Sequence, residues 1–387
     1  MKEEMGLEAF TKSITLCMIV KNESKIITRC LDSAEAIIDS LSICDTGSTD
    51  DTVKIIKNWA KDNGKECTIH HTPFQNFGYN RTLSVNLAQG AYPDSDYLLL
   101  LDADMILQNS LAFHVNNLKS DQYLIMQMNQ DLKYWNTRLI HAKRSWECVG
   151  VTHEYWELKE SPATGTVGKL ENIFILDKED GGSKQDKFER DKRLLEEAVQ
   201  DENQKPLWQR YMFYLAQTYY DLQDYSNAIE WYKKRIAEGG WQEEVYYSML
   251  KIGLAYEQLA NRSSVNLKRE ELLALSLFRL QQAWMYRPSR GEAIYHLARI
   301  HRELKNYQLA YLFAAEGKSI PFPANDLLFV DYTVHDYRFD CELAIAGFYI
   351  EKNKLSGKQA LERLLARKEE LPRHLHPWLE QTSQYYH

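Results

Sequence analysis

The sequence lacks the features that mark membrane, secreted and nucleic-acid-binding proteins. It has no run of 18 apolar residues, and its first ten residues, MKEEMGLEAF, lack the apolar segment of a signal peptide, so we expect no membrane span and no secretion. Its six cysteines form no CxxC pair, which argues against a disulfide framework or a zinc site and favours a cytoplasmic protein with reduced thiols. With 47 basic and 55 acidic side chains, the net charge of -8 gives no general attraction to nucleic acid.

The first hundred residues alternate short apolar runs with helical patterns. The runs are rich in β-branched residues or leucine, and the segments between them place apolar residues at helical spacing. This alternation predicts an α/β fold, in which parallel strands joined by right-handed crossovers are covered on both faces. The predicted strands are 14–20, 41–44, 67–71 and 98–101.

Polar side chains directly follow three of these strands. Asn22 and Glu23 follow the first strand, Asp45 the second, and Asp102 and Asp104 the fourth. Ligands of such sheets bind at the carboxyl ends of the strands, so we expect these side chains to share one site. Two carboxylates one residue apart at a strand end can converge on a divalent cation. A DxD pattern is also frequent by chance, and the alternative is a pair of exposed acids where the strand leaves the sheet.

The chain is long enough for two or three domains. From residue 122 to 176 its pattern becomes strand-like, which predicts antiparallel additions to the sheet. A charged stretch, 177–193, then precedes a strongly helical remainder. We therefore predict two domains, 1–180 and 181–387.

The helical remainder repeats itself. The segment that begins at Tyr214 recurs at His296, 82 positions later, with two alanines and a tyrosine at the same places in both copies. Two units of about 34 residues, with an insertion, account for this distance, and the polar residues 261–270 are the predicted insertion between two helices. The pattern predicts an all-α domain of tetratricopeptide-like repeats.

Four segments, in order and at suitable spacing, resemble a family 2 glycosyltransferase of the GT-A fold. They are CMIVKNES (17–24), CDTGSTDDT (44–52), NFGYNRTLSVNLA (76–88) and LLLLDADMIL (98–107). The resemblance implies a Rossmann-like GT-A domain and inverting transfer from a nucleotide-diphosphate sugar, with UDP as the expected nucleotide. It also implies Mn²⁺ or Mg²⁺ as cofactor.

The resemblance assigns roles to individual residues. Asp45 would accept a hydrogen bond from the base, Arg81 would approach the diphosphate, and the DxD would meet the ribose and the metal. These roles suit the chemistry, since a carboxylate matches a base N–H and an arginine fork matches a phosphate. The implied nucleotide-sugar residues are Val20, Asn22, Glu23, Asp45, Gly47, Ser48, Arg81, Asp102 and Ala103, and the implied metal ligands are Asp102 and Asp104.

Inverting transfer also requires a general base, which removes the acceptor proton. Similar tetratricopeptide-bearing transferases carry a His-Glu pair after a glycine, and here that pair is His153 and Glu154. We predict Glu154 as the base and His153 as the second candidate, either as base or as a third metal ligand. Acids in the hinge before the helices, Asp177, Glu179 and Asp180, are alternatives.

The fused repeats are similar in arrangement to the S-glycosyltransferases that act on bacteriocin precursor peptides, in which repeats help dimerisation. The expected acceptor is a hydroxyl or thiol on a peptide, glycan or lipid, and the repeats would either form a homodimer or act as a rigid buttress. Two other functions stay open. One is a non-catalytic repeat scaffold with a degenerate sugar-nucleotide domain. The other is a haloacid dehalogenase-like phosphatase, whose DxDx[TV] pattern fits poorly because Ile106 stands at its last position.

Overall fold

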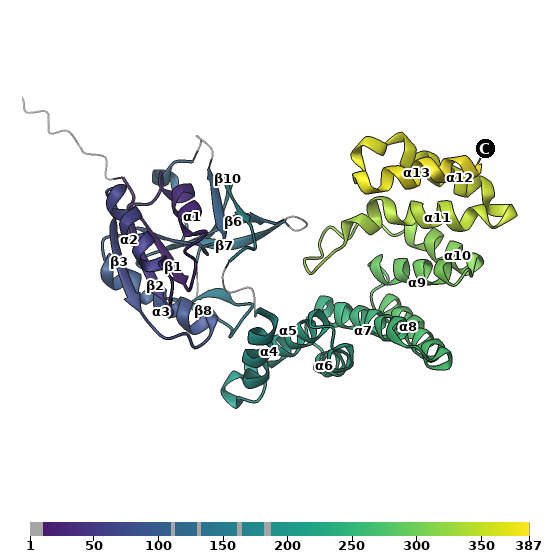
Figure 1. Ribbon diagram of the computed structural model, residues 1–387, viewed down its shortest axis with the longest axis horizontal. Helices are drawn as coiled ribbons and strands as arrows, with labels where there is room; N and C mark the ends of the chain where they lie inside the picture. Colours follow the sequence, from purple (N-terminus) through teal and green to yellow (C-terminus); the bar gives the residue numbers. More distant parts are fainter. Residues whose placement is uncertain (1–10, 110–112, 130–132, 161–164, 182–186, 387) are drawn as a thin grey trace, which may run out of the picture. The chain divides into compact units, whose positions relative to one another are not determined.

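The computed structural model describes residues 11–109, 113–129, 133–160, 165–181 and 187–386 (Figure 1). Residues 1–10, from which we predicted the absence of a signal peptide, lie outside the described residues. In the described part of the chain, no helix has both the length and the apolar character needed to cross a membrane. The chain divides into two compact units, Met1–Ala198 and Val199–His387.

The first unit is an α/β domain and confirms the predicted fold class. Its first half alternates strands and helices: β1 (Ile14–Val20), α1 (Ile27–Ala34), β2 (Ser40–Asp45), α2 (Thr52–Asp62), β3 (Glu66–His71), α3 (Phe77–Ala91) and β4 (Tyr97–Leu100). Its second half contains β5 (Met105–Asn109), β6 (Gln122–Met128), β7 (Lys133–His141), β8 (Trp146–Val149), β9 (Tyr155–Leu158), β10 (Val167–Asp177) and α4 (Lys187–Ala198).

Eight of these strands form one sheet, in the order β3-β2-β1-β4-β7-β6-β10-β5. Strands β1 to β4 pair in parallel, and β7 adds to β4 in antiparallel fashion as predicted. Two details differ from the prediction: β10 is parallel to β6, and β8 and β9 form a separate hairpin. Trp146 of this hairpin belongs to an apolar cluster that includes Val85 and Ala88 of α3.

Helices cover the centre of the sheet on both faces. Alternate residues of β1, such as Leu16 and Met18, pack in one cluster with α1 and α2, whereas Cys17 packs with α3 on the other face. Burial on both faces explains why β1 and β4 are continuous apolar runs without alternation. The first unit therefore has an apolar centre, and its polar groups gather at the strand ends.

A short connection determines the curvature of this sheet. Only residues 101–104 separate β4 from β5, although the two strands lie four positions apart in the sheet. In a flat sheet that separation is about 19 Å, and five extended peptide steps span at most roughly 18 Å. The connection is not extended, since the Met105 amide donates to the Asp102 carbonyl at 3.0 Å. The sheet must therefore curl, and the DxD lies in the turn that joins its centre to its edge.

The second unit is helical, as predicted. Its helices are α5 (Trp208–Asp221), α6 (Tyr225–Ala237), α7 (Gln242–Arg262), α8 (Asn266–Tyr286), α9 (Glu292–Glu303), α10 (Tyr307–Lys318), α11 (Phe339–Phe348), α12 (Lys354–Ala366) and α13 (His376–Ser383). The predicted insertion at 261–270 is not a separate loop. Only residues 263–265 connect the two helices, and the other polar residues lengthen α7 and α8 at their exposed ends.

The predicted domain boundary, 180/181, lies one helix before the observed division of the chain. The charged stretch that we interpreted as a separator contains α4, whose Leu194, Leu195 and Ala198 are buried. Charged residues on the outer face of an amphipathic helix resemble a linker in sequence, so this helix was missed.

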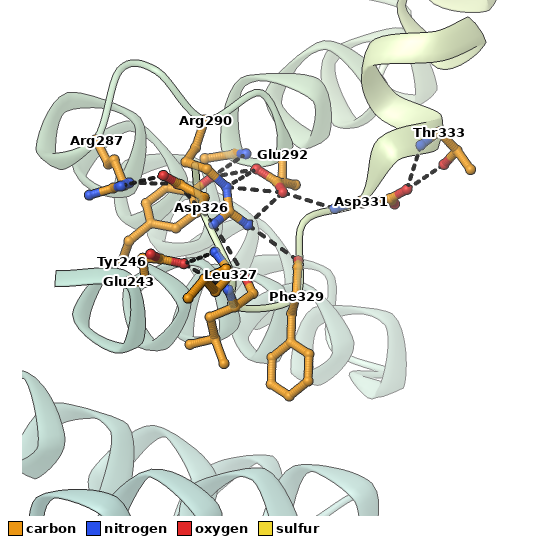
Figure 2. Close-up of polar contacts among 12 residues, drawn as sticks. Glu243, Tyr246, Arg287, Arg290, Glu292, Asp326, Leu327, Phe329, Asp331 and Thr333 are labelled. Atoms are coloured by element: carbon orange, nitrogen blue, oxygen red, sulfur yellow. Dashed lines mark hydrogen bonds and ion pairs between the residues drawn. The ribbon is translucent and has the colours of Figure 1, made fainter. Parts of the chain in front are cut away.

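A buried polar network fastens one loop of the helical unit (Figure 2). Arg290 has no exposed side-chain surface and pairs with Glu292 at 2.6 Å and with Asp326 at 3.4 Å. The backbone amide of Leu327 donates to Glu243 at 2.8 Å (Figure 2). Arg290 is paired with two carboxylates and Glu243 accepts from the loop backbone, so the network holds the loop before α11 against α7 and the segment that leads into α9.

We expect Arg290→Met to destabilise the helical unit by about 3–5 kcal/mol, since Glu292 and Asp326 would stay buried without their shared cation. Denaturant unfolding followed by circular dichroism measures this change in the free energy of unfolding. Arg269→Met, at an exposed position of α8, is the matched control and should shift it by less than about 0.5 kcal/mol. Equal effects of the two variants would contradict a structural role for the network.

Candidate active site

A cavity of about 710 Å³ opens at the carboxyl ends of β1 and β4. Its wall includes residues from both halves of the first unit, and α4 contributes as well. The predicted site residues that line it are Val20, Asn22, Glu23, Arg81, Asp102, Ala103, Asp104, His153 and Glu154. The structure thus brings together polar residues that are far apart in the sequence.

Two loops at the strand ends support one side of the cavity. The side-chain oxygen of Asn22 accepts a hydrogen bond from the Thr49 amide at 2.7 Å, and the Asn22 amide donates to Ser48 at 3.0 Å. Asp45 is buried, accepts from the Ser48 amide at 3.0 Å and contacts His71 Nδ1 at 3.1 Å. Asp45, Gly47 and Ser48 do not line the cavity themselves, but they adjoin Thr46, which does.

Two arginines hold the first carboxylate of the DxD. Asp102 Oδ1 lies 2.7 Å from Arg81, and Oδ2 lies 3.4 Å from Arg138. Burial raises the pKa of Asp102, but the positive charges of the two guanidinium groups outweigh burial, so its pKa is lower than usual. Asp102 is therefore ionised in the folded protein.

Arg138 is itself fixed by a buried chain of polar contacts. Its guanidinium donates to Gln127 Oε1 at 2.8 Å, and the Gln127 amide donates to Asp177 at 2.8 Å. Sequence analysis missed Arg138 and Gln127. The available signal was a polar side chain next to apolar residues of a strand, as Arg138 precedes Leu139 and Gln127 lies between two methionines, because such a side chain must have a partner when it is buried.

Glu154 lies on a loop that is anchored to the start of α3. The amides of Phe77 and Gly78 donate to the carbonyls of Val151 and Gly150, each at 3.0 Å. A Cβ atom on Gly78 would lie 2.3 Å from the Gly150 carbonyl oxygen, so only glycine permits this approach. The Glu154 carboxylate accepts a hydrogen bond from Arg81 Nε at 2.7 Å.

The second carboxylate of the DxD faces a different neighbour. A Cβ atom on Gly181 would lie 3.2 Å from Asp104 Oδ2 and 3.6 Å from Glu23 Oε1, so both carboxylates lie beside the same small space. Among the described residues, no three His, Cys, Asp or Glu side chains form a complete metal cluster. Mg²⁺ commonly binds through one or two carboxylates together with substrate phosphates, and the residues present fit that mode.

Helix α4 also contributes to the cavity. Lys187, Arg190 and Asp191 line it, and the Arg190 guanidinium lies 4.8 Å from the centre of the Phe77 ring. Burial raises the pKa of Asp191, although Arg190 and Lys187 oppose the shift. Counted over the described residues alone, seven carboxylates and five lysine or arginine side chains line the cavity. Its excess of negative charge favours a cation.

The chain was compared with known proteins. Residues 15–176 match the family model described as Glycosyl transferase family 2. A TPR repeat-containing protein of Synechococcus elongatus is 35% identical over 100 residues, 26% of this chain and 22% of that protein. The SPbeta prophage-derived glycosyltransferase SunS of Bacillus subtilis is 36% identical over 95 residues, 24% of this chain and 20% of that one. The matched residues thus span about a fifth of each relative's length.

A solved structure also aligns with much of the chain. It is TarS of S. aureus, with a TM-score of 0.36 and 12% identity over 68% of this chain and 55% of that one.

The lowered pKa of Asp102 predicts how the free energy of unfolding depends on pH in acid. A carboxyl group with a lowered folded-state pKa stabilises the fold at pH values above its unfolded-state pKa, which is about 3.9. This stabilisation is lost as the pH falls from there through the lower, folded-state pKa. Between about pH 5 and about pH 3, the free energy of unfolding should therefore fall less in Asp102→Asn than in wild type. Denaturant titrations at each pH measure the two slopes.

Asp94→Asn, at an exposed position, is the matched control and should keep the wild-type slope. Identical slopes for Asp102→Asn and wild type would show that the arginines do not stabilise an ionised Asp102.

Proposed function

We propose that the chain, whose residues 15–176 match the model of Glycosyl transferase family 2, is an inverting, metal-dependent glycosyltransferase. Its donor is a nucleotide-diphosphate sugar, with UDP as the expected nucleotide. One observation supports this proposal above the others: a single cavity at the carboxyl ends of β1 and β4 contains both aspartates of the DxD and Glu154. Its volume of about 710 Å³ lies in the range of small-molecule sites.

The proposed donor lies between the strand-end loops and the DxD. Val20, Asn22 and Ala103 line the cavity and contact the nucleotide. The neighbouring loop of Asp45, Gly47 and Ser48 faces the base, where a buried carboxylate can accept from a base N–H. The proposed position of the sugar is toward Glu154, which lines the same cavity.

A divalent cation, Mn²⁺ or Mg²⁺, is the proposed cofactor. Asp104 would hold it, with Asp102 as the second DxD ligand, and Glu23 is close enough to join them. The ion would neutralise charge on the departing diphosphate. The excess of carboxylates in the cavity supports a cation rather than a second anion.

Glu154 is the proposed base. One of its carboxylate oxygens takes the proton from the acceptor hydroxyl or thiol while the acceptor atom forms a bond to the anomeric carbon. The bond from that carbon to the diphosphate oxygen breaks, and the nucleoside diphosphate leaves with the electron pair. His153, which lines the same cavity with a φ of 51°, is the second candidate.

The helical unit is proposed to serve the acceptor or the assembly of the enzyme. A peptide, glycan or lipid acceptor and a homodimer through the helices are both compatible with repeat surfaces. Each of the six cysteines is a free thiol, which supports the proposed cytoplasmic location.

Donor binding gives the first test. A ligand at 100 times its dissociation constant stabilises the native state by about 2.7 kcal/mol, so a nucleotide sugar with Mn²⁺ or Mg²⁺ should raise the thermal midpoint by several degrees. UDP-, GDP- and dTDP-sugars are compared, each with and without metal. Asp104→Ala should lose the metal-dependent part of the shift, whereas the exposed control Asp94→Ala should keep it.

If no nucleotide sugar shifts the wild-type midpoint, the chain is not a transferase of this kind and the repeat-scaffold alternative gains support. Release of phosphate from a phosphomonoester would instead identify a phosphatase.

The base assignment is tested by Glu154→Gln. This variant should bind the donor as wild type does but lose transfer by about 10²-fold or more, because a carboxamide cannot accept the acceptor proton. Rates of sugar transfer to an acceptor, or of donor hydrolysis, provide the measurement. Undiminished turnover in Glu154→Gln would remove this residue from the mechanism, and His153→Gln would then be examined in the same assay.

A further inference from the structure

The guanidinium of Arg81 joins the proposed base to the DxD. Its Nε donates to Glu154 Oε1 at 2.7 Å, and its Nη2 lies 2.7 Å from Asp102 Oδ1. All three side chains are largely buried, with exposed fractions of 16% for Arg81, 17% for Glu154 and 24% for Asp102. Two of the five N–H donors of the guanidinium are thus used by two different carboxylates.

This arrangement leaves little positive charge for a diphosphate. Arg81, Glu154 and Asp102 together carry a net charge of one negative unit when all three are ionised, and Arg138 only balances it. A diphosphate that recruited Arg81 would leave at least one of the two carboxylates buried without its closest cation, which is strongly unfavourable. The resemblance-based role of Arg81 as a diphosphate ligand therefore conflicts with its surroundings.

The backbone of α3 supports the same conclusion. The helix that carries Arg81 also fixes the loop of Glu154, through the hydrogen bonds of Phe77 and Gly78 to that loop. Directly after Arg81, Thr82 Oγ1 accepts a hydrogen bond from the Cys148 amide at 2.9 Å. Helix α3 thus holds both the backbone of the Glu154 loop and the Glu154 side chain.

Other basic side chains of the cavity can meet a diphosphate. Lys21, Lys187 and Arg190 line its wall, and Arg190 lies 3.4 Å from Asp191 of the same helix. These three cations carry charge that the Glu154–Arg81–Asp102 bridge does not use. Donor binding therefore does not have to draw on Arg81.

We propose that Arg81 is a positioning residue, which holds the Glu154 carboxylate at a defined place beside the DxD, and that it is not a ligand of the diphosphate. This inference rests on the proposed function. It adds that the arginine that holds the base is itself held in place by the first aspartate of the DxD.

Steady-state kinetics combined with donor binding test this role in Arg81→Gln. A positioning role predicts that the donor-induced rise in thermal midpoint and the KM for donor stay close to wild type, while kcat falls by about 10²-fold or more. If Arg81 acts on turnover by positioning Glu154, the double variant Arg81→Gln with Glu154→Gln should be about as slow as Glu154→Gln alone.

A raised donor KM together with a lost midpoint shift would identify Arg81 as a diphosphate ligand and overturn the inference, and so would an unchanged kcat. Arg81→Lys is the second variant if Arg81→Gln does not fold. Lysine keeps the charge but lacks the fork, so its kcat should be reduced while its donor-induced shift persists. Failure of the proposed function is distinguishable, because then wild type itself shows no donor-induced shift.

Discussion

The first unit depends on the short connection between β4 and β5. Four residues must join the centre of an eight-stranded sheet to its far edge, which is possible only when the sheet curls. The same four residues contain Asp102 and Asp104, so the constraint that shapes the sheet also places both carboxylates at the rim of the cavity. The two acids therefore follow an apolar strand directly and line the cavity at its end.

Charge compensation organises the site around this turn. Negative and positive side chains alternate in a series of contacts: Glu154 contacts Arg81, Arg81 contacts Asp102, and Asp102 contacts Arg138. Gln127 accepts a hydrogen bond from Arg138 and orients it. Each buried charge has an opposite neighbour, which is the condition for tolerating charges away from water. The alternation also separates the two aspartates of the DxD. Asp102 is held between arginines, whereas Asp104 lies beside Glu23 and Gly181, where a cation is favoured.

Much of the fold was predictable because it rests on local patterns. Apolar runs and helical periodicity indicated β1 to β4 and the helices between them, and parallel pairing then placed their polar ends at one edge. Other features depend on distant contacts. The β8–β9 hairpin leaves the sheet to pack on α3, and α4 resembles a charged linker until its apolar face is seen to be buried. Arg138 belongs to the site only because β7 adds next to β4.

The sequence by itself determined the α/β and helical units and the strand-end position of Asn22, Glu23, Asp102 and Asp104, because apolar runs and helical periodicity are local properties. Glu154 was predicted as the base from the family resemblance alone. Tertiary structure alone decided which charges meet. Arg81 and Glu154 are 73 positions apart, and no spacing rule relates them. Their contact exists because the start of α3 receives the hairpin loop at a glycine, an approach of two backbones that only the folded chain can establish.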